Sequence, residues 1–175
     1  MGAAFVTRYA CWADTPVSAL RAADHLLLAL AAELTLPEGT FSCTHLVRGE
    51  RPRVALSFTL PSEPLLRTAE ERLRAQGYEV RPGVPDAVGR AVIYSGADSL
   101  NGTVTVGELL ARSAIDRVTV LGAAGQPPAG QTLVMHGHVR PQWEGGELVL
   151  ATMPAVGGTL VPFEVPDPTP CCADH

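Results

Sequence analysis

Apolar residues in the first half of the chain recur alternately at strand spacing and at helix spacing, and this alternation most constrains the fold. Over residues 3–86 the predicted order is strand, helix, strand, strand, helix, strand. The two middle strands are separated by a short polar turn and should form a hairpin. This order is that of the ferredoxin-like split βαβ sandwich. We therefore expect an α+β protein that begins with a ferredoxin-like domain.

Residue types at the ends and along the faces of the two helices support this order. Asp14 and Pro16 suit the cap and first position of one helix, and Ser62 with Pro64 suits the start of the other. Gly77 suits the end of the second helix. Apolar side chains of both helices and of the strand between them should meet in one core, which comprises Leu20, Leu27, Leu56, Phe58, Leu66 and Leu73.

The run Arg-Pro-Gly-Val-Pro-Asp at 81–86 ends this regular pattern. After it we expect a short helix at 103–113, followed by short strands at 117–121, 132–139, 147–152 and 159–165. The pattern predicts four segments along the chain. They are a ferredoxin-like domain at 1–88, a linker at 89–103, a smaller β-rich domain at 104–165 and a Pro-rich, Cys-containing tail at 166–175.

Composition argues against several classes of function. The net charge of -5 disfavours nucleic-acid binding, because contacts to phosphate depend on clustered basic residues. All 13 basic residues are Arg, so the chain has no lysine for a pyridoxal phosphate Schiff base or a nucleotide-binding P-loop. No apolar run approaches the ~20 residues that span a bilayer, which argues against a membrane protein. Four Cys in a chain without a signal peptide indicate thiols in a reducing cytoplasm.

Metal ligands are concentrated near the end of the sequence. His136 and His138 lie in the run Met-His-Gly-His, and Cys171, Cys172 and His175 lie in the tail. Imidazole and thiolate ligands together favour zinc or copper. On an extended strand the two histidines would face the same side, whereas adjacent cysteines face opposite sides. The alternatives are a transition-metal site with a structural or sensing role, or ordinary strand histidines beside two free thiols.

Cys43 and His45 form a second pair, two residues apart on a predicted strand. They could act as nucleophile and general base, or add ligands to the metal site. The simpler interpretation is a core cysteine beside a hydrogen-bonded histidine, since free cysteine behaves as a small buried hydrophobe. Cys11 is expected in the core as well, and Asp24 on the solvated edge of the first helix.

The last third of the chain carries the run Val-Pro-Phe-Glu-Val-Pro at 161–166 and Pro-Thr-Pro-Cys-Cys at 168–172. Together with the segment 139–143 and the glycine pair at 157–158, these motifs resemble the C-terminal part of small, uncharacterised actinobacterial proteins. The resemblance implies a bacterial origin. It implies no activity, because no function is attached to that group.

Three functions remain open from the sequence. The first is a small cytoplasmic protein whose tail binds a transition metal. The second is an accessory enzyme that acts on a small molecule in a cleft between the domains, with His45, His136 or His138 as general acid or base. The third is a non-enzymatic interaction protein, in which the ferredoxin-like sheet forms a homodimer and the Pro-rich tail docks a partner.

Overall fold

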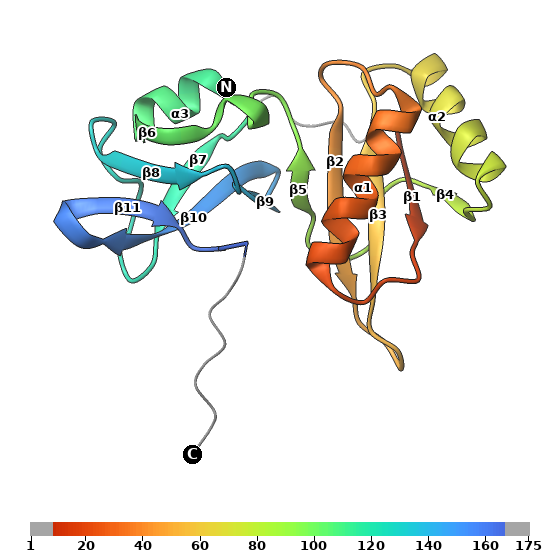
Figure 1. The fold of residues 1–175 in the computed structure, drawn as a ribbon, viewed down its shortest axis with the longest axis horizontal. Coiled ribbons are helices and arrows are strands. Elements are labelled where there is room, and N and C mark those ends of the chain that lie inside the picture. The colour runs from red at the N-terminus through yellow and green to blue at the C-terminus, as the bar shows by residue number, and fades with distance from the viewer. Residues whose placement is uncertain (1–8, 167–175) are drawn as a thin grey trace.

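The protein is a mixed α/β structure, described over residues 9–166 by a computed structural model. Three α-helices and one 11-stranded sheet account for its regular structure in this range. The chain forms two lobes, each with strands and at least one helix, and a central strand lies between them (Figure 1). Within residues 9–166, no helix combines the length and apolarity needed to cross a bilayer.

The N-terminal lobe is built from four strands and two helices. They are β1 (Ala10–Asp14), α1 (Leu20–Leu34), β2 (Phe41–Val47), β3 (Arg53–Thr59), α2 (Glu63–Ala75) and β4 (Val80–Pro82). The strands lie in the order β4-β1-β3-β2, and each neighbouring pair is antiparallel. Apolar residues of α1 and α2 cover one face of this sheet, and the opposite face is left for other contacts.

One apolar core holds the N-terminal lobe together. Leu27, Leu56, Phe58 and Leu73 are all buried in it, and the partly buried Leu20 and Leu66 pack against it. These are the six residues that the sequence pattern assigned to a common core, so that prediction is confirmed. Cys11 is fully buried in the same cluster. The helical stripes and the inward face of β3 therefore cover each other as their spacing requires.

The predicted helix and strand ends are less accurate than the predicted faces. Helix α1 begins at Leu20, because Asp14 completes β1 and its carboxylate pairs with Arg53 at 2.6 Å. The hydroxyl of Thr15 donates to the carbonyl of Val54 and so ties this segment to the sheet before the helix starts. Ser62 does occupy the cap position of α2, but its side chain makes no capping hydrogen bond.

The segment expected as a linker contains regular structure. Strand β5 (Arg90–Ile93) pairs antiparallel with β2 and extends the N-terminal sheet. On its other side β5 meets β9 of the second lobe through the pair Arg90 and Gln142. The remainder of the segment holds the 3-10 turn η1 (Ala97–Ser99) and the start of β6. The sheet is thus continuous through β5, while the strands of each lobe stay grouped on its two sides.

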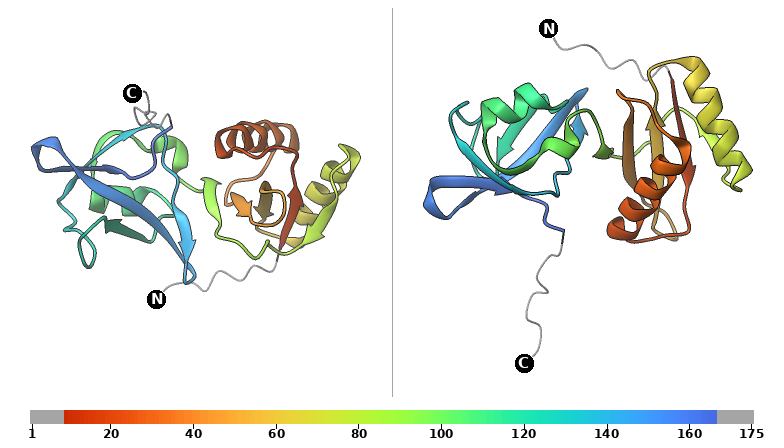
Figure 2. Two further views of the ribbon diagram at one scale, coloured as in Figure 1. Left: turned by 90° about the horizontal axis from the view of Figure 1, so that it is seen from below. Right: turned by 45° about the horizontal axis from the view of Figure 1, so that its top comes forward.

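The C-terminal lobe is rich in short strands, as its sequence predicts. In chain order it contains β6 (Asn101–Thr105), α3 (Val106–Arg112), β7 (Arg117–Val120), β8 (Thr132–His136), β9 (Gln142–Glu144), β10 (Glu147–Ala155), the 3-10 turn η2 (Val156–Gly158) and β11 (Thr159–Pro162). The helix expected at 103–113 is shorter, because residues up to Thr105 pair with β8. Strand β10 contacts β7, β9 and β11 and organises this lobe (Figure 2).

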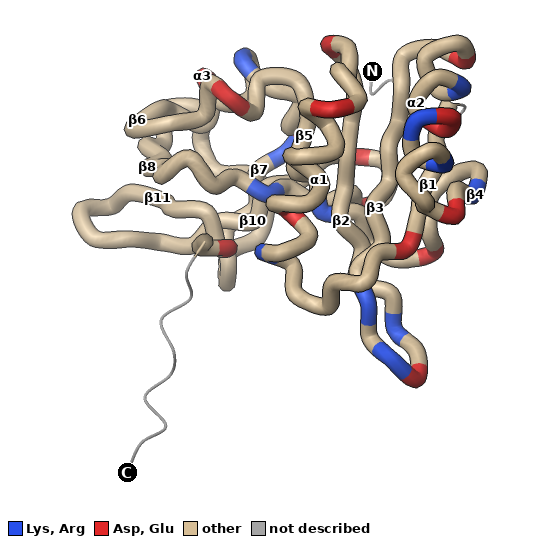
Figure 3. The backbone as a smooth tube through the Cα atoms, turned by 45° about the vertical axis from the view of Figure 1, so that its right-hand side comes forward, with Lys and Arg blue, Asp and Glu red and all other residues tan. Residues whose placement is uncertain are grey.

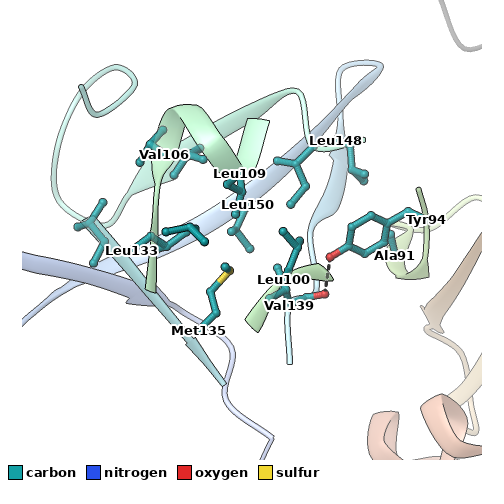
Figure 4. Packing of buried hydrophobic residues seen from close by; sticks show 14 of the residues in the cluster. Ala91, Tyr94, Leu100, Val106, Leu109, Leu133, Met135, Val139, Leu148 and Leu150 are labelled. Atoms are coloured by element: carbon teal, nitrogen blue, oxygen red, sulfur yellow. Dashed lines mark hydrogen bonds between the residues drawn. The ribbon is translucent and has the colours of Figure 1, made fainter. Parts of the chain in front are cut away.

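A second apolar core fills the C-terminal lobe. Side chains from β8, β10 and α3 converge in it, with Leu133, Leu148 and Leu109 fully buried (Figure 4). Tyr94 reaches into this core from the end of β5, and its hydroxyl donates to the carbonyl of Val139 at 3.0 Å. Burial raises the pKa of Tyr94, so the hydroxyl remains a donor. Each lobe therefore has its own core, with β5 between the two.

Candidate functional site

Strands β2 and β5 present different chemistry on their two faces. Thr44 pairs with Arg90 on the face that α1 covers, whereas Cys43 pairs with Ala91 on the opposite face. His45 shares that opposite face, because side chains two residues apart on a strand point the same way. Two candidate sites therefore lie back to back. One is neutral and includes Cys43 and His45, and the other is charged and is centred on Arg90.

In the neutral site His45 connects a serine to the backbone. Its Nε2 lies 2.7 Å from Oγ of Ser57, and its Nδ1 lies 3.2 Å from the carbonyl oxygen of Ala87. A carbonyl can only accept, so Nδ1 carries the proton and donates to Ala87. Nε2 then has a lone pair and accepts the hydroxyl proton of Ser57. The backbone carbonyl thereby fixes both the tautomer and the orientation of the imidazole.

Cys43 extends this hydrogen-bond chain. Its side chain is hydrogen-bonded to Trp143 and to Ser57. The indole of Trp143 can only donate, and the hydroxyl proton of Ser57 is already directed at His45. The sulfur of Cys43 accepts from the indole of Trp143, and the interactions with Trp143 and with Ser57 both act to lower the pKa of the thiol. Trp143, Cys43, Ser57 and His45 thus form one connected cluster of side chains that ends at the carbonyl of Ala87.

Burial keeps the titratable members of this chain neutral. Desolvation raises the pKa of Cys43 to about 12, although its hydrogen bonds to Trp143 and Ser57 act in the opposite direction. Desolvation also lowers the pKa of His45 below its ordinary 6.5, against the effect of the bond to Ala87. A protonated thiol is a poor nucleophile. The geometry thus favours Ser57, rather than the Cys43 suggested by the sequence, as the group that His45 can deprotonate.

A small cavity opens beside this chain. Its volume is about 230 Å³, and it is lined by Cys43, His45, Ser57, Thr59, Val84, Ala87, Val88, Gly89, Trp143 and Gly146. Gly89 permits the close approach of two walls, because a Cβ there would lie 3.1 Å from Cδ1 of Trp143 and 3.2 Å from Cε1 of His45. Trp143 is also packed against Phe41, with ring centroids 5.4 Å apart.

The charged site is centred on the buried guanidinium of Arg90. Nη1 donates to Asp24 at 2.5 Å and to Thr44 at 3.0 Å, and Nη2 donates to Asp24 at 3.0 Å. Nε donates to Glu164 at 2.7 Å, and Nη2 is also paired with Glu164. All five N–H donors of Arg90 therefore have acceptors. Asp24 belongs to α1 and Glu164 follows β11, so one side chain joins both lobes.

Arg140 and His138 extend this cluster. Arg140 donates from Nε to Asp24 at 3.0 Å, and Nε2 of His138 lies 3.0 Å from Glu164. Burial alone would raise the pKa of both carboxyls, but hydrogen bonds and the positive charge of Arg90 outweigh it and lower the pKa of each. Both carboxylates are thus held in the charged form. Acidic and basic positions meet where α1 faces the C-terminal lobe (Figure 3).

The structure separates the two histidines expected to share a metal. Strand β8 ends at His136, and the following Gly137 has a φ of 73°, so the extended geometry that would align the side chains is lost. His136 is exposed, whereas His138 pairs with Glu164. Between residues 9 and 166, no group of three or more His, Cys, Asp or Glu is arranged to hold a metal ion.

The other expected ligands, Cys171, Cys172 and His175, lie outside the described residues. Nothing in the structure therefore tests their part in a zinc or copper site. The metal site in the tail stays a prediction from the sequence. Of its expected ligands, His136 is the one whose imidazole is described and exposed.

Several residues of both sites were not identified from the sequence. Asp24 was expected at a solvated helix edge, but it is only 3% exposed, so that expectation is wrong. Ser57 could have been placed on the face shared with His45, because large apolar residues alternate with Ala55, Ser57 and Thr59 in the sequence of β3. Nothing local indicates that Trp143 covers that face, or that Glu164 reaches Arg90.

Comparison of the chain with models of known protein families, with curated proteins and with solved structures finds no match.

Proposed function

We propose that this protein is an enzyme acting on a small uncharged ester or related acyl compound in the cavity beside Ser57. The observation that carries this proposal is the chain from Ser57 through His45 to the carbonyl of Ala87, set in the wall of that cavity. A hydroxyl bonded to the free nitrogen of an oriented, neutral imidazole is the arrangement of an activated serine nucleophile.

The proposed chemistry follows from the directions of these hydrogen bonds. Oγ of Ser57 attacks the carbonyl carbon of the substrate, and its proton passes to Nε2 of His45. His45 then returns that proton to the departing alcohol, and an acyl group remains on Ser57. Water hydrolyses this ester in a second step, again with His45 as base. The carbonyl of Ala87 orients the imidazole throughout, in the role that a carboxylate has in many hydrolases.

The walls of the cavity favour a particular class of substrate. Apolar side chains of Val84, Val88 and Trp143 line it, and it has no Asp, Glu, Lys or Arg among its lining residues. A charged substrate would lose its hydration without gaining a partner there. The volume of about 230 Å³ lies below the roughly 300–1,000 Å³ of most ligand pockets. The substrate part that enters is therefore a short acyl chain or a single ring.

A fluorophosphonate probe tests the proposal, because it forms a covalent bond from phosphorus to an activated serine and releases fluoride. We expect one adduct on the folded protein, mapped to Ser57 by peptide mass spectrometry. Ser57→Ala should abolish it, and His45→Gln should slow it by about 100-fold or more, the usual contribution of a general base. Ser42→Ala is the matched control, since this serine of β2 lies on the face that α1 covers.

Two results would contradict the proposal. One is a folded wild-type protein that forms no adduct at Ser57 under excess probe. The other is an adduct that forms equally fast in wild type and His45→Gln, since Ser57 would then not depend on the imidazole. The labelling rate should also rise with pH and level off below neutrality, because burial lowers the pKa of His45 below its ordinary 6.5.

We also infer that residues 10–82 form a ferredoxin-like split βαβ sandwich. The strand order β4-β1-β3-β2, with the core between its sheet and both helices, supports this inference. In the proposed enzyme this domain supplies Ser57 and His45 from the sheet face that its own helices leave uncovered. The C-terminal lobe supplies Trp143 as the opposing wall.

A further inference from the structure

A larger cavity lies on the other side of β5 and next to α1. It measures about 460 Å³, and its lining includes Arg21, Arg90, Arg140, His138, Asp24 and Glu164. The lining holds three arginines and two carboxylates, so its positive charge exceeds its negative charge by one even with both lining histidines, His25 and His138, neutral. A cavity of this composition attracts anions.

Part of the negative charge in this cavity comes from a short segment that follows β11. Glu164 lies in this segment, between Phe163 and Val165, which are 54% and 45% exposed. Apolar burial therefore contributes little to holding the segment against the protein. The N–H of Phe163 donates to the carbonyl of Ala151, and the carboxylate of Glu164 provides the main attachment beyond that point.

Glu164 is bound in the manner of a ligand. Both of its oxygens face Nε of Arg90, at 2.7 and 3.0 Å, and one of them also faces Nε2 of His138 at 3.0 Å. A planar carboxylate matches the side of a guanidinium formed by Nε and Nη2. Asp24 holds the opposite side of Arg90 and would keep the guanidinium in place if Glu164 left.

We infer that Arg90, Arg140 and His138 form a binding site for a small carboxylate compound, and that Glu164 occupies this site from within the same chain. An external carboxylate binds by displacing the segment 163–166. The site is separate from the Ser57 cavity and does not depend on the proposed enzymatic function. Glu164 lowers the apparent affinity of the external ligand, because only the fraction of molecules with the segment released can bind it.

Malonate is a suitable probe, since it carries two carboxylates on a compact frame. Its affinity is measured by isothermal titration calorimetry for wild type, Glu164→Gln and Glu164→Ala. We expect malonate to bind both variants at least about 10-fold more tightly than wild type, because the internal competitor is removed. Inorganic phosphate should show a smaller gain, since a tetrahedral anion fits the planar Arg90 donors less well. Glu147→Ala is the matched control, because Glu147 pairs with Arg117 in an exposed ion pair of 3.0 Å.

Two substitutions at Glu164 are used so that the test does not depend on the folding of a single variant. Glu164→Gln keeps the size of the side chain and removes its charge, so it serves if the alanine variant does not fold. A folded Glu164→Gln protein that binds malonate no more tightly than wild type and Glu147→Ala would overturn the inference. Glu164 would then only fasten the segment. Saturating malonate should also raise amide hydrogen exchange in residues 163–165 of wild type, and unchanged exchange there would count equally against displacement.

Discussion

The two faces of β2 and β5 carry opposite kinds of chemistry on the same two strands. On the face toward α1, Thr44 and Arg90 belong to a hydrogen-bond network that is built around ion pairs. On the other face, Cys43 and His45 belong to a chain of neutral groups. The difference lies in what covers each face. Helix α1 brings the carboxylate of Asp24 to one side, whereas Trp143 brings an aromatic ring to the other.

The two networks also differ in whether their polar groups are fully paired within the protein or stand beside space that a ligand can enter. Every donor of Arg90 meets an acceptor, and the resulting network ties α1 to residues of the C-terminal lobe. The neutral chain runs along a cavity wall, so the oxygen of Ser57 stands beside space that a ligand can enter. A saturated network suits stability, while an ordered chain beside a cavity suits chemistry. The comparison leads to three predictions about stability, beginning with the largest.

Replacing Arg90 by Met should destabilise the protein most. The substitution leaves Asp24 buried beside Arg140 alone and deprives Glu164 of its main partner. Removing one member of a buried ion pair costs about 3–5 kcal/mol, which chemical denaturation would detect as a lower free energy of unfolding. Arg67→Ala is the control, since its pair with Glu63 is mostly exposed and should contribute less than about 1 kcal/mol. Equal losses in the two variants would show that the Arg90 network is not stabilising.

Replacing His45 by Gln should change the pH dependence of stability more than its absolute value at neutral pH. The folded protein binds the imidazole proton less readily than the unfolded chain, because burial lowers the pKa of His45. Stability should therefore fall as the pH drops from 6.5 toward the lower folded-state pKa, by at most about 1.4 kcal/mol per pH unit. The Gln variant should lack this component in denaturation curves recorded at a series of pH values below 7. His25→Gln, at an exposed position outside the Ser57 cavity, is the control and should retain the component that His45 contributes.

Replacing Ser42 by Ala should have the smallest effect. Oγ of Ser42 is buried in the face toward α1, and among the described residues it has no hydrogen-bond partner. Removing a buried hydroxyl without a partner should change the free energy of unfolding by less than about 1 kcal/mol, in the stabilising direction if at all. A clear loss of stability on denaturation would mean that this hydroxyl does have a partner in solution.

The residues that face the core follow from the sequence, but the two sites do not. Periodicity suffices to place Leu27 and Phe58, because a helical stripe or an alternating strand is a local pattern. Arg90 is not part of such a local pattern, because its strand β5 has only four residues and is defined by its pairing with β2 and β9. Its bonds to Asp24 and Glu164 join residues that are 66 and 74 positions apart. Only the folded chain shows these contacts.

The candidate chemistry was predicted in part. The sequence indicated Cys43 and His45 as a pair on one face, which the strand register supports. It did not indicate that Ser57 stands between them in the hydrogen-bond chain, because that depends on the register of β3 against β2. Two residues on one strand reveal their common face, whereas the neighbour that joins them belongs to the next strand.

Strand β10 has a consequence for the order in which the chain can fold. It pairs with β9 and β11, which adjoin it in sequence, and with β7, which precedes it by some 30 residues. During synthesis the N-terminal lobe can close once β4 has emerged, but residues of β7 must wait for β10 before they gain a partner. Until then the apolar side chains of β7 and α3 remain without their cover. The C-terminal lobe is therefore the part of this protein that should depend most on protection from aggregation while it is being made.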